Sequence, residues 1–334
     1  MSDKKCVREK YLYLSAMLRA REARMLTREK AERMISAASF SDAAKMLTDC
    51  GYADMSGMSP KELDGALNGH RAAIFSEIAA ISPDRELVDI FRMKYDYHNA
   101  KTLIKAEARG VGRGDLMSGS GRIAPEALEK SFTEENYLSV PPVLAAAMNE
   151  AKQTLARSQN PQLSDLILDR AYFAELSAAA EKLGSRFLSG YAKTLIDGAN
   201  LRAAVRTLRM KKDPEFLKSV LTEGGETDLR RVLQAASSAE TLPALYAGTV
   251  FKNAAELGAQ AAQGGSLTEF ELACDNAVTA YLTGAKLTSY GEAPVIAYLA
   301  AVEDEIRAVR MILTGFAAGI SPDTVRERLR EFYA

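Results

Sequence analysis

The chain has 334 residues, of which 47% are hydrophobic and 26% are charged, as in ordinary globular proteins, and its length suits two or three domains. Its 43 basic and 44 acidic residues leave a net charge of -1, which excludes a general electrostatic attraction to nucleic acid. No apolar run approaches the roughly 20 residues of a membrane-spanning helix, so we expect no membrane span.

The cysteines and the N-terminus favour a reducing, cytoplasmic location. Cys6, Cys50 and Cys274 are odd in number and far apart, which predicts neither a disulfide framework nor a metal site. The N-terminal stretch KKCVREKYLYLSAMLRARE places basic residues before an apolar run, but Arg19 and Arg21 interrupt that run too early for a secretory signal. We therefore expect the first helix there.

Taken in chain order, the sequence predicts helices and no sheet. Alanine, leucine, glutamate, lysine and arginine dominate, and apolar residues recur three and four positions apart along almost every segment. No stretch shows the sustained alternation of apolar and polar residues that is typical of a strand. Thr27, Ser82–Pro83 and Ser321–Pro322 are residue types that begin helices. The predicted fold class is all-α.

Two breaks divide the chain. GVGRGDLMSGSG at 110–121 and EGGET at 223–227 are rich in glycine, which favours flexible connectors. The first break could suggest phosphate binding, but it follows a helix instead of a strand and contains no GK[ST] sequence. The breaks predict three helical domains, at residues 1–112, 113–223 and 224–334.

The three segments resemble copies of one helical module. Asn99, Asn200 and Glu305 recur at separations of 101 and 105 residues, and each is followed by two basic residues. A second anchor lies 31, 31 and 30 residues upstream of them, at Leu67–Asn68, Leu168–Asp169 and Cys274–Asp275. Two anchors with nearly constant spacing, found three times, indicate a triplicated module whose period is longer than that of the common solenoid repeats.

The clearest single helix is expected from about Pro83 to Arg109. Apolar residues cover most of its circumference, which indicates a largely buried, central helix. The apolar stripe comprises Ile90, Met93, Tyr97, Ala100 and Ile104, and its flanks comprise Leu87, Phe91, Tyr95 and Thr102. The remaining narrow face carries Lys94, Lys101, Lys105 and Arg109, and the second copy repeats it with Arg202, Arg206 and Arg209.

Each module therefore offers a strip of basic residues, for which two interpretations are open. In the first, the strip is a solvated face whose lysines pair with nearby glutamates such as Glu107. In the second, the strips of the three modules converge on an acidic or carbonyl-rich partner. The residues predicted for this candidate partner-binding surface are Lys101, Lys105, Arg202, Arg206, Arg307 and Arg310.

The sequence predicts no catalytic, cofactor-binding or metal-binding residue. His98 is the obvious candidate, but the other two modules have Ala199 and Asp304 at its position, and no cluster of ligands accompanies it. We expect a partly buried polar histidine. Asn99, Asn200 and Glu305 are expected to satisfy neighbouring polar groups inside the fold. No GxSxG, HExxH or DxDxDG motif occurs, which disfavours an enzyme.

Several stretches resemble a known family, including VDIFRMKYDYHNAKTLIKAEARG and GEAPVIAYLAAVEDEIRAVRMILTGFAAGISPDTVRERLREFYA. They are similar to the C subunits of bacterial and archaeal V/A-type rotary ATPases, which are related to the d subunits of eukaryotic V-ATPases. The resemblance runs from about residue 7 to residue 334 in the expected order. The glycine-rich stretch at 110–121 is less typical of the family.

The resemblance implies a fold and a function. It implies a funnel of three similar all-helical domains around a pseudo-threefold axis. Such a protein caps the cytoplasmic face of the membrane rotor ring, receives the foot of the central shaft made by the D and F subunits, and passes torque between them for proton or sodium transport. It carries no catalytic residue and no cofactor, because ATP is hydrolysed or made on the A and B subunits.

A second interpretation stays open at this point. Triplicated helical modules serve many adaptors, so the chain can also be a stand-alone helical scaffold that binds another protein partner. Binding to the D and F subunits and to ring preparations distinguishes the two. The coupled ion, the direction of the machine and the number of ring subunits are properties of other chains.

Overall fold

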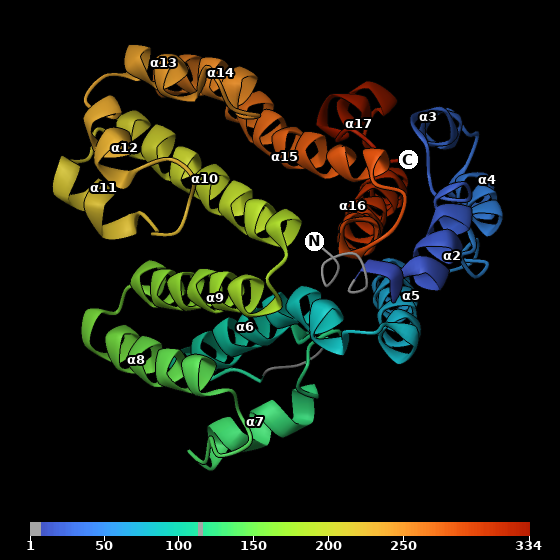
Figure 1. Cartoon of the computed structure of the whole chain (residues 1–334), viewed down its shortest axis with the longest axis horizontal. Coiled ribbons are helices and arrows are strands. Elements are labelled where there is room, and N and C mark those ends of the chain that lie inside the picture. Colours follow the sequence, from blue (N-terminus) through green and yellow to red (C-terminus); the bar gives the residue numbers. More distant parts are fainter. Residues whose placement is uncertain (1–7, 113–115) are drawn as a thin grey trace. The chain divides into compact units, whose positions relative to one another are not determined.

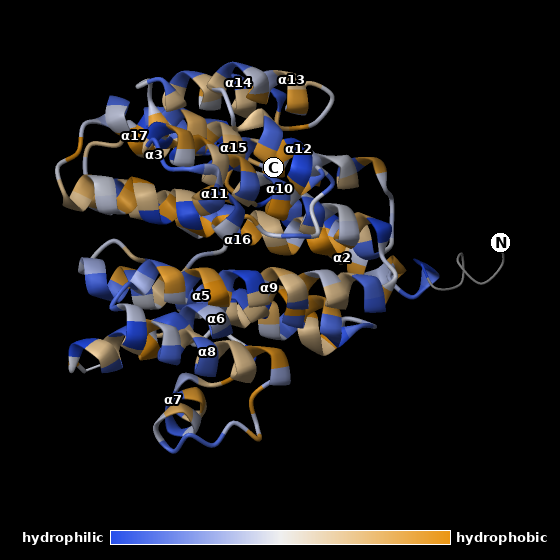
Figure 2. Ribbon diagram, turned by 90° about the vertical axis from the view of Figure 1, so that its left-hand side faces the viewer, coloured by the Kyte–Doolittle hydropathy of each residue, from blue (hydrophilic) through white to orange (hydrophobic). Residues whose placement is uncertain are grey.

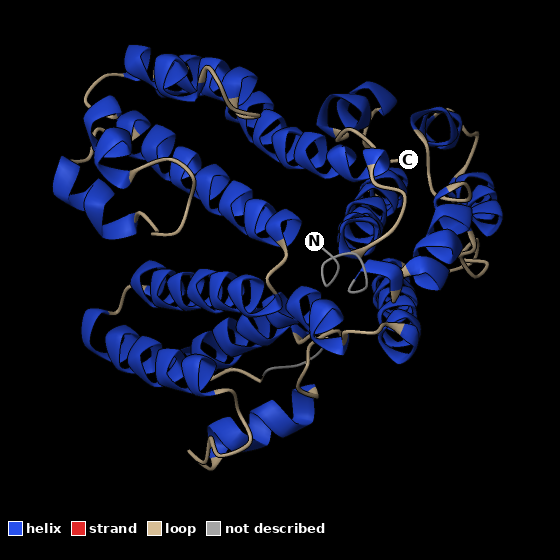
Figure 3. Ribbon diagram, in the orientation of Figure 1, coloured by secondary structure: helices blue, strands red, loops and turns tan. Residues whose placement is uncertain are grey.

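The computed structural model describes residues 8–112 and 116–334 (Figure 1). Every regular element in these ranges is a helix and none is a strand (Figure 3). The all-α prediction is therefore confirmed for the described residues. Cys6 and residues 113–115 of the first glycine-rich break lie outside the described residues. Residue 113, the first residue of the second predicted domain, is therefore among those that are not described.

The described residues form two compact units, one made of residues 8–71 and 186–334 and the other of residues 72–112 and 116–185. The long α5 helix (Pro60–Ile81) contributes to both. The boundaries between three domains, at 112–113 and 223–224, stay a prediction, and so does the funnel.

The unit of residues 72–185 is built around α6. Its helices, besides the end of α5, are α6 (Arg85–Arg109), α7 (Pro125–Thr133), α8 (Pro142–Ser158) and α9 (Pro161–Leu183). α8 and α9 lie side by side, and α6 packs against both. The whole predicted stripe of α6, from Ile90 to Ile104, is buried. The expectation of a central helix is confirmed, because a helix with so wide an apolar surface must be covered on most sides.

The other unit joins the two ends of the chain. Its helices are α2 (Leu12–Glu22), α3 (Arg28–Ile35), α4 (Phe40–Lys45), η1 (Met46–Cys50), the start of α5, α10 (Arg186–Arg209), α11 (Pro214–Val220), α12 (Leu229–Ala235), η3 (Ala239–Thr241), α13 (Leu242–Tyr246), α14 (Lys252–Ala262), α15 (Leu267–Thr283), η4 (Gly284–Leu287), α16 (Glu292–Ala317) and α17 (Pro322–Arg328). α2, α3 and α4 pack against α16, whereas α11, α12, α14 and α15 pack against α10. Tyr246, Phe251 and Phe270 fill the core beneath α10.

Two of the three predicted helix starts are confirmed. Thr27 caps α3 by accepting a hydrogen bond from the backbone N–H of Lys30, and Ser321 caps α17 with Pro322 as its first residue. The third start is shifted. α6 begins only after Asp84, because the hydroxyl of Ser82 donates to the carbonyl of Asp84 and holds these residues in a turn.

Hydrophobic and hydrophilic residues are mixed along each helix (Figure 2). Among the described helices, none is both long enough and apolar enough to span a bilayer.

A similar order of elements follows two of the three longest helices. α6 is followed by a connector, the short α7 and the pair α8–α9. α10 is followed by the short α11, a connector, the short elements α12, η3 and α13, and the pair α14–α15. α16 lies near the end of the chain and packs instead with α2, α3 and α4 from the other end, and its Arg310 pairs with Asp64 at the start of α5. We name these the α6 group, the α10 group and the two-ended α16 group.

Candidate functional site

Buried polar residues join the α6 and α10 helices to the connectors that follow them. The side-chain amide of Asn99 donates to the carbonyl of Ser118 over 2.9 Å, and its oxygen accepts from the N–H of the same residue over 2.7 Å. Asn200 makes both bonds with Thr222, each at 2.8 Å. One amide thus satisfies both backbone groups of one residue. The predicted structural role of these asparagines is confirmed.

Glu305 makes the corresponding junction in the two-ended α16 group. Its carboxylate accepts from the N–H of Leu26 over 2.5 Å and from the hydroxyl of Tyr52 over 2.8 Å. Leu26 precedes α3 as Ser118 precedes α7. The N-terminal segment therefore takes the place of the connectors. Burial raises the pKa of Glu305, although the bonds from Leu26 and Tyr52 oppose the shift.

Two buried aspartates make further hydrogen bonds to the same connectors, in addition to those of Asn99 and Asn200. Asp96, three residues before Asn99, accepts from the N–H groups of Arg122 and Ile123 over 2.9 and 3.2 Å. Asp197 accepts from the N–H groups of Glu226 and Thr227 over 3.2 and 3.1 Å. The glycine content of both stretches predicts flexible connectors. In their described parts they are held by hydrogen bonds, which the glycine content alone does not indicate.

A glycine precedes the two N–H donors in each connector. A Cβ atom on Gly121 would collide with the carboxylate of Asp96, and one on Gly225 would collide with the carboxylate of Asp197. These glycines let the backbone approach an aspartate closely. The sequence signal for this contact is an aspartate three residues before the repeated asparagine, followed by a glycine 25 or 28 residues later.

The basic strip of α6 binds α9 within its own group. Lys101 pairs with Asp169 and Lys105 pairs with Asp165, each at 2.6 Å. Glu107, the suggested neighbour for these lysines, pairs instead with Lys152 on α8, at 3.2 Å. The strip thus braces two helices against each other.

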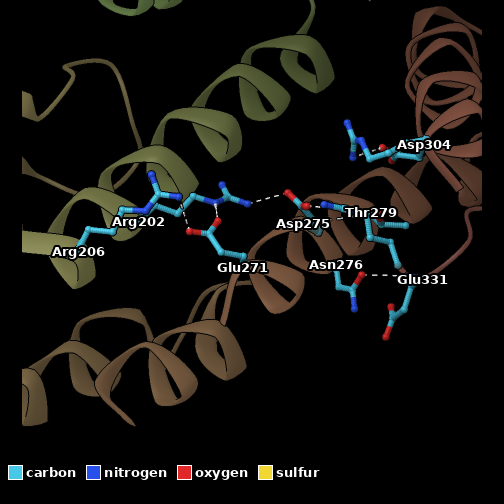
Figure 4. Close-up of polar contacts among 10 residues, drawn as sticks. Arg202, Arg206, Glu271, Asp275, Asn276, Thr279, Asp304 and Glu331 are labelled. Carbon is cyan, nitrogen blue, oxygen red and sulfur yellow. Dashed lines mark hydrogen bonds and ion pairs between the residues drawn. The ribbon is translucent and has the colours of Figure 1, made fainter. Parts of the chain in front are cut away.

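α10 and α16 use their strips in a similar way. Arg202 pairs with Glu271 and Asp275 of α15 at 2.6 Å each, and Arg206 pairs with Glu271 at 2.7 Å (Figure 4). Arg310 pairs with Asp64 of α5 at 2.7 Å. Arg307 is different, because its acidic partner, Asp304, lies on its own helix.

The partners form a repeat that the sequence pattern reveals only in part. Asn68, Asp169 and Asp275 stand out in the sequence as anchors, but not as partners of the basic strips. Each has an acidic residue four positions earlier, one helical turn away on the same face, and these are Asp64, Asp165 and Glu271. Asp165 with Asp169 and Glu271 with Asp275 are acidic pairs, and in the third copy Asp64 is followed by the polar Asn68. This spacing, repeated opposite the basic residues of the strips, is the signal that identifies the partners.

The six candidate residues differ in how much of the side chain solvent can reach. Arg202 and Lys101 are 22% and 23% exposed, whereas Arg206 and Arg307 are 59% and 43% exposed. Burial alone would lower the pKa of Arg202, but the adjacent Asp275 and Glu271 carboxylates raise it above its ordinary value. Arg202 is thus a permanent cation in an ion-pair network, and of the six candidate residues Arg206 and Arg307 are the most open to a partner.

The predicted burial of His98 is wrong. His98 lies on the exposed side of α6, and its Nε2 atom is 3.2 Å from the carbonyl oxygen of Leu116. The neighbouring Asn99 occupies the buried side, since successive helical residues point about 100° apart. Among the described residues, no group of three or more histidine, cysteine, aspartate or glutamate side chains has the arrangement of a metal site.

Comparison with known proteins matches nearly the whole chain. Residues 14–328 match the family model of the ATP synthase (C/AC39) subunit. The C subunit of the V-type sodium ATPase of Enterococcus hirae is 24% identical over 330 residues, covering 97% of this chain and 99% of the relative. The C subunit of the A-type ATP synthase of Methanocaldococcus jannaschii is 23% identical, with 96% and 86% covered. The C subunit of the V-type ATP synthase of Thermus thermophilus is 22% identical over 203 residues, with 59% and 62% covered.

Proposed function

Because the chain belongs to the ATP synthase (C/AC39) subunit family, we propose that it is the central-stalk adaptor of a V/A-type rotary ATPase or ATP synthase. Family membership makes it a structural component of such a complex and not the catalytic one. In the proposed role it binds the D and F shaft subunits and the subunits of the membrane rotor ring. It lies on the cytoplasmic face of the membrane and passes torque for proton or sodium transport.

The observation that supports this role is the bracing of each long helix by ion pairs to a second helix of its own group. A component that carries torque must resist sliding between its helices. A partly exposed ion pair contributes only about 0.2–1 kcal/mol to stability. However, charges at 2.6–2.7 Å on facing helices fix the register of those helices, and a close-packed helical interface transmits strain with little give.

The same strips supply a candidate surface for partners. We propose that the six basic residues, led by the exposed Arg206 and Arg307, face acidic or carbonyl-rich segments of the shaft or the ring. The strongly exposed guanidinium groups keep N–H donors available beyond those used by their internal partners. Several modest polar contacts of this kind, one set in each group, add up by multivalency.

Binding assays with purified shaft and ring subunits test the proposal. We expect the wild-type chain to bind the D/F shaft or the ring, and Arg206→Glu to weaken that binding at low salt by about tenfold or less, an effect that fades at high salt as screening increases. Lys218→Glu, on the exposed face of α11, is the matched charge reversal and should leave binding unchanged.

Three outcomes separate the alternatives. Weaker binding at low salt in Arg206→Glu, with Lys218→Glu unchanged, supports the adaptor role and its basic surface. Binding that neither variant changes supports the adaptor role and returns Arg206 to an internal brace. A wild-type chain that binds neither the shaft nor the ring contradicts the adaptor role and favours a stand-alone scaffold.

A further inference from the structure

The C-terminal segment, residues 329–334, follows α17 without helical structure and crosses elements that are distant in sequence. Arg330 pairs with Asp275 of α15 at 2.6 Å. The N–H of Glu331 donates to the side chain of Asn276, also on α15, over 2.9 Å (Figure 4). Arg330 and Glu331 thus attach the segment to two successive residues of one helix.

The end of the segment attaches to the first helix of the unit. Tyr333 is only 3% exposed, and its hydroxyl lies 3.3 Å from Arg19 and from Glu22 of α2. The ammonium group of Lys286, in η4, lies 4.9 Å from the centre of the Tyr333 ring, within the range of a cation–π interaction. The segment therefore touches α2, α15 and η4 over a few consecutive residues.

α2 and η4 also meet directly beneath the segment. The guanidinium group of Arg19 donates to the carbonyls of Ala285 and Thr288 over 2.7 and 3.0 Å. Burial alone would lower the pKa of Arg19, but its bonds to Glu22 and Tyr333 raise it above its ordinary value. The tail thus covers a contact between the N-terminal helix and the end of α15.

We propose that residues 329–334 are a clasp that closes the two-ended α16 group against α15. The α6 and α10 groups are each continuous in sequence, so their helices stay together through the chain itself. The N-terminal helices of the α16 group reach α16 only through contacts between distant parts of the chain, apart from the covalent path through α5. The clasp holds α2 against α15 and η4 at the end of the chain. This inference does not depend on the proposed function.

Asp275 connects the clasp to α10. One carboxylate oxygen accepts from Arg202 and the other accepts from Arg330, both over 2.6 Å. The two arginines therefore share one acceptor, and the arrangement of the C-terminal segment is coupled to the basic strip of α10.

Hydrogen exchange of the full-length protein tests the clasp. Arg330→Gln should make the amides of α2 exchange up to about fivefold faster, because loss of one partly exposed ion pair promotes local opening by up to about that factor. Arg328→Gln removes the same charge from an exposed neighbouring position and should leave α2 unchanged. Unchanged exchange of α2 in Arg330→Gln, or equal acceleration in both variants, would overturn the proposal.

A disulfide provides a second measurement that does not depend on how much one ion pair contributes. The pair Asn276→Cys and Glu331→Cys, in a chain whose native cysteines are replaced by alanine, tests the contact by cross-linking on mild oxidation, because the side chain of residue 276 reaches the backbone N–H of Glu331 over 2.9 Å. In the Arg330→Gln background the disulfide should restore protection of α2, and reduction should remove it again. A disulfide that forms without protecting α2 would contradict the clasp.

Discussion

Asn200 and Glu305 occupy the same position on two long helices but face different partners. Asn200 meets the carbonyl and the N–H of Thr222, so it must donate one hydrogen bond and accept another. Glu305 meets an N–H from Leu26 and a hydroxyl from Tyr52, so both of its oxygens accept. An amide suits the first arrangement and a carboxylate suits the second. The identity of the residue follows from whether its connector is continuous with the helix or comes from the other end of the chain.

The connectors of the α6 and α10 groups can be compared in the same way through Asp96 and Asp197. Of the substitutions considered, removal of Asp96 should lower the free energy of unfolding most. Asp96 is fully buried, pairs with Arg122 at 2.6 Å and also accepts from the backbone. Asp96→Ala leaves a partly buried guanidinium with one carboxylate fewer, and we expect it to lower the free energy of unfolding by about 3–5 kcal/mol. Asp197 is hydrogen-bonded by the backbone of Glu226 and by the backbone and side chain of Thr227, and among the described residues it has no basic partner like Arg122. Asp197→Ala should therefore cost about 1–3 kcal/mol.

Urea unfolding followed by circular dichroism measures both losses. Asp89→Ala is the control, since Asp89 is partly exposed and its contact with Arg92 is 3.7 Å long, and it should cost less than about 1 kcal/mol. Equal losses for Asp96→Ala and Asp197→Ala would show that the pair with Arg122 contributes nothing beyond the backbone bonds.

The next largest effect should come from the glycines that let the connectors approach. In Gly121→Ala the added methyl group meets the Asp96 carboxylate and lies 3.3 Å from the carbonyl of Ile123. We expect a loss of about 1–3 kcal/mol from this overpacking. Gly119→Ala, two residues earlier, faces open space and should change stability by less than about 0.5 kcal/mol. Similar melting temperatures for the two variants would contradict the close approach.

The sequence is sufficient to predict the helices but not their partners. The stripe from Ile90 to Ile104 predicts a buried helix, because helical periodicity is a local property. The repetition of Asn99, Asn200 and Glu305 correctly predicts residues that bond inside the fold. The donors they bond to lie up to 279 residues away, in Leu26 for Glu305, and no local pattern identifies a contact over such a separation.

The basic strips illustrate a second limit. A basic face on one helix has the same pattern whether its partner is solvent, another protein or a second helix of the same chain. The acidic pairs at 165 and 169 and at 271 and 275 could have indicated the third possibility, since their spacing repeats that of the lysines and arginines. The predicted start of α6 is wrong by one or two residues, and His98 is assigned to the wrong side of the helix. The end residues of a helix and the side on which a single residue lies are the features that periodicity defines least well.

Exchanging the acid and the amide, as Glu305→Gln or Asn200→Asp, should change the free energy of unfolding least, and the change should depend on pH. Because burial raises the folded-state pKa of Glu305, its contribution to stability is complete below the ordinary value of 4.5 and is lost as pH rises through the higher folded value. Wild-type stability, relative to that of Glu305→Gln, should therefore fall by about 1.4 kcal/mol for each unit by which the pKa is raised. Melting temperatures between pH 4 and pH 8 measure this slope, and Glu327→Gln, at an exposed position of α17, is the control.

Asn200→Asp is the reverse exchange and should create a slope of the same sign in the α10 group. An ionised carboxylate at this position would face the carbonyl oxygen of Thr222, to which Asn200 now donates over 2.8 Å, whereas a protonated one can still donate to it. We expect the variant to approach wild-type stability at acidic pH and to lose about 1–2 kcal/mol as pH rises to 8, because the buried acid must then ionise beside an acceptor. A variant that is equally stable at both ends of this range would mean that the connector at Thr222 moves away to solvate the charge. The two junctions would then differ in the mobility of the connector and not in the donors that it presents.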